Sequence, residues 1–213
     1  MVCTKASLGT GFVCFEQNEH FWFQAWYRID GSTRPFTLAD LEGREVKESP
    51  GIRLMLFEGQ ELGVELKALE KPKYRQAANQ RFTFPTDQWV QVTWHVLLHP
   101  DEGHVQVWQD EQLVLDGRGP TLPFKEMMYD SLEVGISAHS FGDQAATLFV
   151  DDVRITTEPL VEIRPWRHGC LLRRQGGGIV TSADKRLKPD YTPAELIAPQ
   201  PEIRHSSSTG NTP

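Results

Sequence analysis

The feature that most constrains this chain is an alternation of apolar and polar side chains within residues 89–99, which is strict from Val90 to Val96. Successive side chains of a β-strand point to opposite faces, so a two-residue period predicts a long strand with one buried face. The face expected to be buried carries Val90, Val92, Trp94, Val96 and Leu98, and the opposite face carries Gln91, Thr93, His95 and His99. In a helix, with 3.6 residues per turn, side chains of the two sets would lie on the same face.

The same pattern recurs along most of the chain. The segments 104–109 and 112–116 extend the first strand into a meander, and Pro100 and Gly103 bound the first turn, where Gly103 is expected for its tolerance of positive φ. Further strands are expected at 21–29, 36–39, 52–57, 62–67, 81–84, 132–138 and 147–156. Short strands at this spacing are typical of antiparallel sandwiches. We therefore predict an all-β fold, a two-sheet antiparallel β-sandwich (jelly roll) with a mostly irregular C-terminal tail.

Charge and proline are unevenly distributed along the 213 residues. Residues 1–156 carry 23 acidic and 14 basic side chains, whereas residues 157–213 carry 6 acidic and 8 basic ones and half of the 14 prolines. We therefore predict a jelly-roll domain at 1–157 and a Pro/Gly-rich, largely irregular tail at 158–213. In this tail the sequence Thr192-Pro-Ala-Glu195 is a helix-capping pattern, which allows a short helix over 193–198.

Several classes of protein are excluded by composition. No apolar run approaches the roughly 18–20 residues of a membrane span, and no segment is basic enough to predict a nucleic-acid partner. The first ten residues show no recognisable signal peptide, and the sequence leaves localisation and oligomeric state open. The cysteines, Cys3, Cys14 and Cys170, lack metal-binding or redox spacing, which favours free thiols, although a Cys3–Cys14 bridge stays open.

Three segments resemble the concanavalin A-like lectin/glucanase superfamily, and in particular its heparin-lyase-like and laminin-G-like jelly rolls. They read Trp89-Val-Gln-Val-Thr-Trp-His-Val96, Gly103-His-Val-Gln-Val-Trp-Gln-Asp-Glu-Gln-Leu-Val114 and Leu148-Phe-Val-Asp-Asp-Val-Arg-Ile155. The resemblance covers about residues 10–157. It implies two curved sheets, a sugar chain lying in a groove of the concave sheet, and an extracytoplasmic location. One departure is the hairpin turn, which has Glu111 and Gln112 where the superfamily has glycine.

Members of this superfamily bind glycans, hydrolyse them, cleave them as lyases or mediate protein contacts, so the resemblance predicts no single reaction. We predict polysaccharide or oligosaccharide binding through the concave face. Two alternatives stay open: a polysaccharide lyase that acts on uronic-acid-containing glycans by β-elimination, and a laminin-G-like protein-interaction module. Whether the protein is an enzyme is left open. A glycoside hydrolase is disfavoured, since Glu61 and Glu65 would lie ~13 Å apart along a strand, against the ~5–5.5 Å of a retaining pair.

Lyase chemistry directs attention to His95. A uronate lyase must neutralise the substrate carboxylate and remove the C5 proton, which requires amide, cationic or imidazole groups around a base. Alginate lyases of this fold carry Gln-Ile-His on one strand, and the matching positions here are Thr93-Trp94-His95. His95 is therefore the candidate catalytic residue. Its companions would come from Gln91, Gln106, Arg28 and either Tyr27 or Tyr129, provided that these share its groove.

Aromatic and polar side chains also share the face that carries His95. Trp22 and Trp26 share one face of a strand with Gln24 and Arg28, and Trp108 shares one face of another strand with Gln106 and His104. Flat rings flanked by hydrogen-bonding groups suit a sugar, which has an apolar face and a polar rim. The candidate glycan-binding residues are Trp26, Arg28, Gln91, His95, Gln106 and Trp108. The alternative is that the tryptophans belong to the core.

Two metal hypotheses differ in their support. His95 and His99 lie four residues apart on a strand, which separates them by ~13 Å, too far for one ion. The resemblance instead implies a structural Ca²⁺ at Asp151 and Asp152, which match an Asp-Asp pair in the last strand of many jelly-roll carbohydrate modules. Calcium takes six to eight oxygen ligands, so adjacent carboxylates suit it. The alternative is a pair of carboxylates that bond only to the protein and to water.

Overall fold

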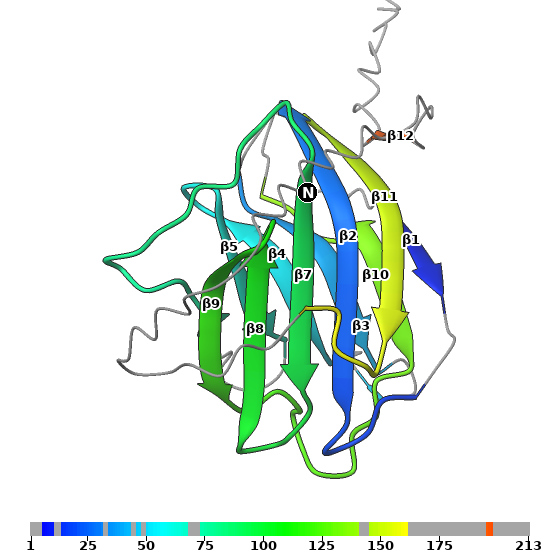
Figure 1. Cartoon of the computed structure of the whole chain (residues 1–213). Coiled ribbons are helices and arrows are strands. Elements are labelled where there is room, and N and C mark those ends of the chain that lie inside the picture. The colour runs from blue at the N-terminus through cyan, green and yellow to red at the C-terminus, as the bar shows by residue number, and fades with distance from the viewer. Residues whose placement is uncertain are drawn as a thin grey trace, which may run out of the picture.

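The computed structural model describes residues 6–10, 14–31, 34–43, 46–47, 50–67, 73–140, 145–161 and 195–197. These residues form two six-stranded antiparallel sheets stacked face to face, and the described part of the chain contains no helix (Figure 1). It accordingly includes no helix of the length and apolar character needed to cross a membrane. The predicted all-β, two-sheet sandwich is confirmed.

The first sheet has the strand order β1-β10-β3-β4-β5-β6. Its strands are β1 (Ala6–Thr10), β10 (Ser131–Ile136), β3 (Phe36–Glu42), β4 (Gly51–Phe57), β5 (Glu61–Leu66) and β6 (Lys73–Tyr74). The segment predicted as a strand at 81–84 contributes only a single bridge, between Thr83 and Glu61. Pro85, which cannot donate to a ladder, follows it directly.

The second sheet, in front in Figure 1, has the order β12-β11-β2-β7-β8-β9. Its strands are β12 (Glu195–Ile197), β11 (Ala146–Thr156), β2 (His20–Gly31), β7 (Val90–Leu97), β8 (Gly103–Gln109) and β9 (Gln112–Gly119). The predicted meander of three strands is confirmed as β7, β8 and β9. In its second turn the left-handed conformation is taken by Asp110, with φ of 54°, and not by Glu111 or Gln112, which stand where the superfamily has glycine.

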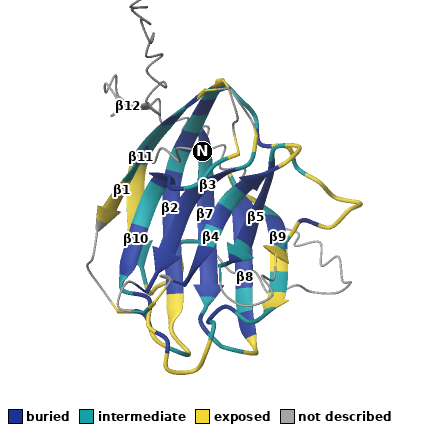
Figure 2. Ribbon diagram, turned by 180° about the vertical axis from the view of Figure 1, so that it is seen from behind, coloured by how far each residue is buried: buried dark blue, intermediate teal, exposed yellow. Residues whose placement is uncertain are grey.

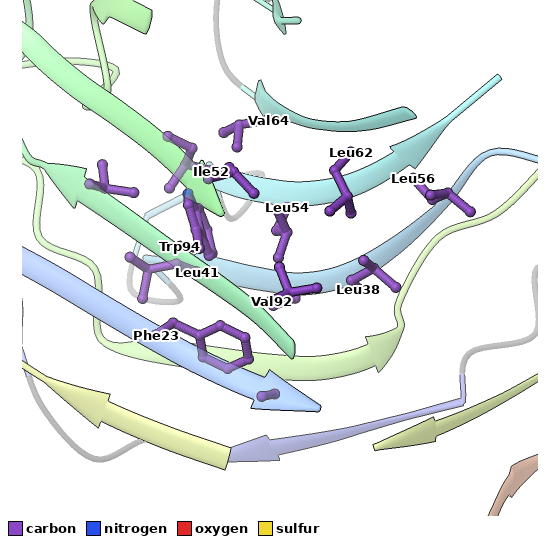
Figure 3. Packing of buried hydrophobic residues seen from close by; sticks show 14 of the residues in the cluster. Phe23, Leu38, Leu41, Ile52, Leu54, Leu56, Leu62, Val64, Val92 and Trp94 are labelled. Atoms are coloured by element: carbon purple, nitrogen blue, oxygen red, sulfur yellow. The ribbon is translucent and has the colours of Figure 1, made fainter. Parts of the chain in front are cut away.

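The core lies between the sheets and is built by the alternation described above. Figure 3 shows Phe23, Val92 and Trp94 of the second sheet facing aliphatic side chains of the first, and all three are completely buried. The Trp94 ring meets the ring of Phe21 edge to face, with 5.3 Å between centroids. Burial runs along the central strands, whereas exposed residues gather in turns and on the edge strands β1 and β9 (Figure 2).

Gly103 is needed for a reason other than the predicted one. It is the first residue of β8, and it is not among the residues with positive φ. A Cβ at this position would instead lie 2.7 Å from the carbonyl oxygen of Gly119 and would collide with Thr121. The Thr121 hydroxyl accepts from the His99 amide (2.8 Å) and donates to the Leu97 carbonyl (2.7 Å), so it is fixed. Close packing of β8 against β9, not turn geometry, requires this glycine.

The short helix allowed over 193–198 is wrong for the residues that the structure describes there. Glu195–Ile197 form β12, paired with Thr147–Phe149 of β11. A helix of one or two turns is marginal in isolation, whereas β11 offers a row of backbone partners along its open edge. Residues 162–194 and 198–213 of the tail, which include Cys170, lie outside the described residues, as does Cys3. Cys14 is an exposed free thiol.

Candidate functional site

The candidate site lies on the outer face of the second sheet, the face turned away from the core. Trp22 of β2 is opposite His95 of β7, His95 is opposite Gln106 of β8, and Gln106 is opposite Asp116 of β9. Opposed residues of antiparallel strands point to the same face, so the four side chains form one row across four strands. The predicted sidedness of His95 and Gln106 is confirmed.

The rings in and beside this row are stacked and buried. The ring of Trp22 lies 4.2 Å from that of His95, at 21° between planes, and 5.7 Å from that of Trp108, at 25°. Trp22 is 1% exposed, His95 3% and Trp108 8%, yet none of the three belongs to the core cluster between the sheets. His95 and Trp108 thus lie on the predicted face as supporting groups packed among neighbours. Contact of either with a glycan stays a prediction.

A chain of hydrogen bonds runs along the row and continues past both ends. His20 Nδ1 lies 2.8 Å from His95 Nε2, and His95 Nδ1 lies 3.2 Å from Gln106 Oε1. Gln106 Nε2 donates to Asp116 Oδ2 (3.3 Å), and the other oxygen of Asp116 lies 2.6 Å from His104 Nε2. His20, at one end, and Asp116, beside the other end, are exposed, so the chain joins two surface groups through a buried middle.

The carboxylate of Asp116 fixes the direction of this chain, because it can only accept hydrogen bonds. Gln106 must therefore turn its NH₂ group toward Asp116, which leaves its oxygen to accept from His95 Nδ1–H. A neutral His95 with a proton on Nδ1 has a lone pair on Nε2, which accepts from His20 Nδ1–H. The geometry thus assigns the same tautomer, protonated on Nδ1, to both histidines.

The environment keeps His95 neutral. Burial lowers the pKa of His95 to about 4, since a buried imidazolium loses its hydration, and the bond to Gln106 offsets this only in part. With Nδ1 donating to Gln106 and Nε2 accepting from His20, a neutral ring has both nitrogens occupied. His95 is therefore poorly placed to take a proton from a substrate carbon.

The tyrosines named as companions of His95 lie elsewhere. Tyr27 is completely buried in the core and donates to the Leu38 carbonyl (3.0 Å), and Tyr129 is equally buried and donates to the Thr121 carbonyl (2.8 Å). Burial raises the pKa of both phenols. Because Tyr27 is an odd-numbered residue of β2 and Trp22 an even one, they point to opposite faces. The expectation that either tyrosine shares a groove with His95 is wrong.

The other predicted residues gather farther along the same face, around the middle of β2. Trp26 is opposite Gln91 and Asp151, and Arg28 is opposite Phe149. Trp89 precedes β7, and its ring meets that of Phe149 edge to face, 6.4 Å between centroids. We call Trp26, Arg28, Trp89, Gln91 and Phe149 the aromatic platform. All five are half-buried, so part of each side chain reaches solvent.

Arg28 is held in place at the centre of the aromatic platform. Its Nε and Nη2 donate to the two oxygens of Asp30, at 3.0 and 2.9 Å, and its guanidinium carbon lies 5.3 Å from the centre of the Phe149 ring. The hydrogen bonds to Asp30 raise the pKa of Arg28, which stays charged. Sequence reasoning found Arg28 but missed Trp89 and Phe149. The shared parity of Trp89 and Gln91 was an available signal, whereas Phe149 meets Arg28 only through the pairing of β11 with β2.

The carboxylates predicted to bind calcium lie at a bulge in β11. The register with β2 shifts between Asp151 and Arg154, and Asp152 has a φ of 50°. Asp151 Oδ1 accepts from the Asp152 amide (2.8 Å), and Asp152 is exposed. In the described part of the chain, no group of three or more His, Cys, Asp or Glu side chains could hold a metal. Calcium binding, which also uses backbone oxygens, stays a prediction.

Glu61 and Glu65, weighed above for hydrolysis, have structural partners on the first sheet. Glu61 is 3% exposed and forms a two-point ion pair with Arg75, with oxygens 3.0 and 2.5 Å from Nε and Nη2. Glu65 pairs with Lys73 at 3.2 Å. Both glutamates belong to β5, on a different sheet from His95, and each forms an ion pair with a basic side chain.

No protein-family model matches the sequence, and no curated protein matches it. Among solved structures, the chain is similar to a cellulose-induced protein, Cip1, with a TM-score of 0.52 and 16% identity over 72% of this chain and 73% of that one. It is also similar to the CBM40 of the Ruminococcus gnavus IT-sialidase bound to α2,6-sialyllactose (TM-score 0.43, 12% identity, 74% and 95% covered). A third is the SAP-like pentraxin of Limulus polyphemus (0.43, 10%, 70% and 70%). The similarity to Cip1 shows a shared β-sandwich fold of the jelly-roll type.

Proposed function

We propose that this protein binds a carbohydrate on the outer face of the second sheet, at the aromatic platform, and that it belongs to the concanavalin A-like superfamily. One observation carries the proposal: half-buried rings and hydrogen-bonding side chains lie side by side there on three neighbouring strands. This is also the face that carries His95, which the sequence resemblance connects with sugar binding.

The chemistry of the platform suits a sugar ring. Trp26 offers an apolar surface to the C–H face of a pyranose, while Gln91 offers amide groups to its hydroxyls. Arg28 already uses two of its donor groups on Asp30 and keeps others for a ligand. Because its charge is compensated by Asp30, the platform does not require an acidic sugar.

Isothermal titration calorimetry with cellohexaose, xylohexaose, laminarihexaose and polygalacturonate tests the proposal. We expect at least one neutral hexasaccharide to bind, and we expect Arg28→Ala to weaken it by roughly tenfold, since a hydrogen bond to a charged donor is lost. Lys73→Ala is the matched control, because Lys73 also pairs with a carboxylate and lies 5.6 Å from a ring, but on the other sheet. Absence of binding to all four ligands contradicts the proposal.

The lyase alternative predicts a different result. β-Elimination leaves an unsaturated product that absorbs at 235 nm, and its most direct candidate base, His95, has both ring nitrogens bonded within the protein. We therefore expect no increase in absorbance with polygalacturonate, alginate or heparin. An increase that His95→Ala abolishes would replace the binding proposal with the lyase.

A further inference from the structure

We propose that His20 is a second ligand-contact residue, which accepts a hydrogen bond from a sugar hydroxyl through Nε2 and is oriented by the chain His95–Gln106–Asp116. The proposal rests on the carbohydrate-binding function argued above. It assigns a role to a residue that carried no motif in the sequence, and it extends the binding surface along β2.

The first observation is that His20 is held rigidly although it is exposed. Its Nδ1 lies 2.8 Å from His95 Nε2, the ring centroids are 5.1 Å apart, and the planes differ by only 12°. A nitrogen–nitrogen contact this short between nearly parallel rings at that separation places the rings edge to edge in almost one plane. The hydrogen bond therefore fixes the rotation of the His20 ring, and His95 is itself wedged against Trp22.

The second observation is the direction of the chain. Asp116 accepts from Gln106, Gln106 accepts from His95, and His95 accepts from His20. This order places a proton on His20 Nδ1, so in the neutral ring Nε2 carries the lone pair and points away from His95. No described residue bonds to that nitrogen. A fixed, exposed acceptor beside a stacked ring cluster is a preorganised partner for a donor group of a ligand.

The ligand class follows from the spacing along β2. His20 and Trp26 are six residues apart on one strand and share one face, which places them ~20 Å apart at ~3.3 Å per residue. A disaccharide at the platform is too short to reach His20, whereas an extended oligosaccharide along β2 reaches both. The structure therefore points to an extended glycan with a hydroxyl group at the position that faces Nε2.

Long-range ¹H–¹⁵N NMR spectra of the histidine side chains test the orientation without any glycan. We expect both His20 and His95 to carry the proton on Nδ1 at neutral pH. Asp116→Ala frees Gln106 to turn its amide, so we expect the Nε2–H form to increase at both histidines. His104→Gln is the matched control, since it removes the other partner of Asp116 and leaves the chain intact. A wild-type His95 protonated on Nε2 overturns the proposal.

Titration with cellohexaose and cellobiose, or with the corresponding pair from whichever neutral series binds, tests the contact. We expect His20→Phe to weaken the hexasaccharide roughly tenfold and to leave the disaccharide unchanged. His20→Gln, which restores an amide near the position of Nε2, is expected to recover part of the loss. Equal hexasaccharide affinity in wild type and His20→Phe overturns this inference but leaves the platform standing. If the wild type binds neither sugar, the carbohydrate-binding function itself fails, and this inference with it.

Discussion

His95 shows how one residue on the polar side of a strand becomes part of a buried network. Its parity places it opposite the core, but Trp22 on one side and Gln106 on the other enclose it. The ring is kept neutral by burial and is used as a connector, with a donor on one nitrogen and an acceptor on the other. The exposed group that can meet a ligand is therefore His20.

Acid should destabilise the protein through His95. Its pKa is lowered to about 4 in the folded state, against about 6.5 for an unfolded chain. Between pH 6.5 and pH 4, His95 binds a proton in the unfolded chain but not in the folded one. The stabilisation that comes from the neutral His95 ring is therefore complete above pH 6.5 and is lost as the pH falls toward 4. The loss is on the order of 3 kcal/mol. Urea denaturation at pH 7.0, 5.5 and 4.5 measures it.

His95→Gln is the control for that measurement. Glutamine keeps hydrogen-bonding groups at this position but does not titrate, so its stability should fall less steeply with acid than that of the wild type. Identical slopes for the two proteins would show that His95 titrates normally when folded.

The burial of His95 could not be predicted from the sequence, whereas its sidedness could. The alternation around Trp94 fixes which side chains share a face, because the period of a strand is a local property. The partners of His95 come from β2 and β8, and which residue lies opposite which depends on strand register. His20 was missed for the same reason, since only the pairing of β2 with β7 brings its ring to His95.

Among the strands, the contact between β8 and β9 depends on Gly103. Gly103→Ala should destabilise the fold by up to about 3 kcal/mol, and by more than the comparison variant below, because the added methyl group meets the Gly119 carbonyl and the fixed Thr121 side chain. Gly59→Ala is the comparison, since Gly59 has a φ of 81° and no atom within 4 Å of the added methyl. It should cost about 1 kcal/mol through backbone strain alone. Equal costs in thermal or urea unfolding would refute the packing explanation.

The bulge of β11 carries the calcium hypothesis. If Asp151 and Asp152 contribute to a structural Ca²⁺, removing calcium with EGTA should lower the melting temperature, and adding Ca²⁺ back should restore it. Asp152→Asn should abolish this difference, since its exposed carboxylate is the simplest ligand to remove. A melting temperature that EGTA leaves unchanged would show that the pair acts without metal.

Strand β12 marks the limit of local prediction. Thr192-Pro-Ala-Glu195 is a good helix start by its own residues, but Glu195–Ile197 pair with the open edge of β11. Capping contributes only about 1 kcal/mol, whereas the edge of a sheet offers several backbone hydrogen bonds at once. The alternation around Trp94 predicted its strand more reliably, because many consecutive residues of that strand follow the same two-residue period.

The two outer faces of the sandwich differ in the chemistry of their side chains. The first sheet covers its outer face with ion pairs, in which Asp40 is bonded to Arg53 at 2.8 Å and Glu65 to Lys73. The second sheet covers its outer face with rings, amides and imidazoles. The all-β class was predictable because each strand shows the two-residue period in its own sequence. The aromatic platform was only half predictable, since Trp89 and Phe149 meet across β2 and their contact depends on strand pairing.

Binding at the aromatic platform is tested most directly by the indole ¹H–¹⁵N spectrum of the protein, which has six tryptophans, during titration with the hexasaccharide that binds. Carbohydrate binding at the aromatic platform predicts that the indole signals of Trp26 and Trp89 shift with the added sugar. Trp94, which is completely buried between the sheets, is the internal control and should stay in place. If the sugar binds while the signals of Trp26 and Trp89 remain unchanged, the ligand lies elsewhere on the protein and the aromatic platform is not the binding site.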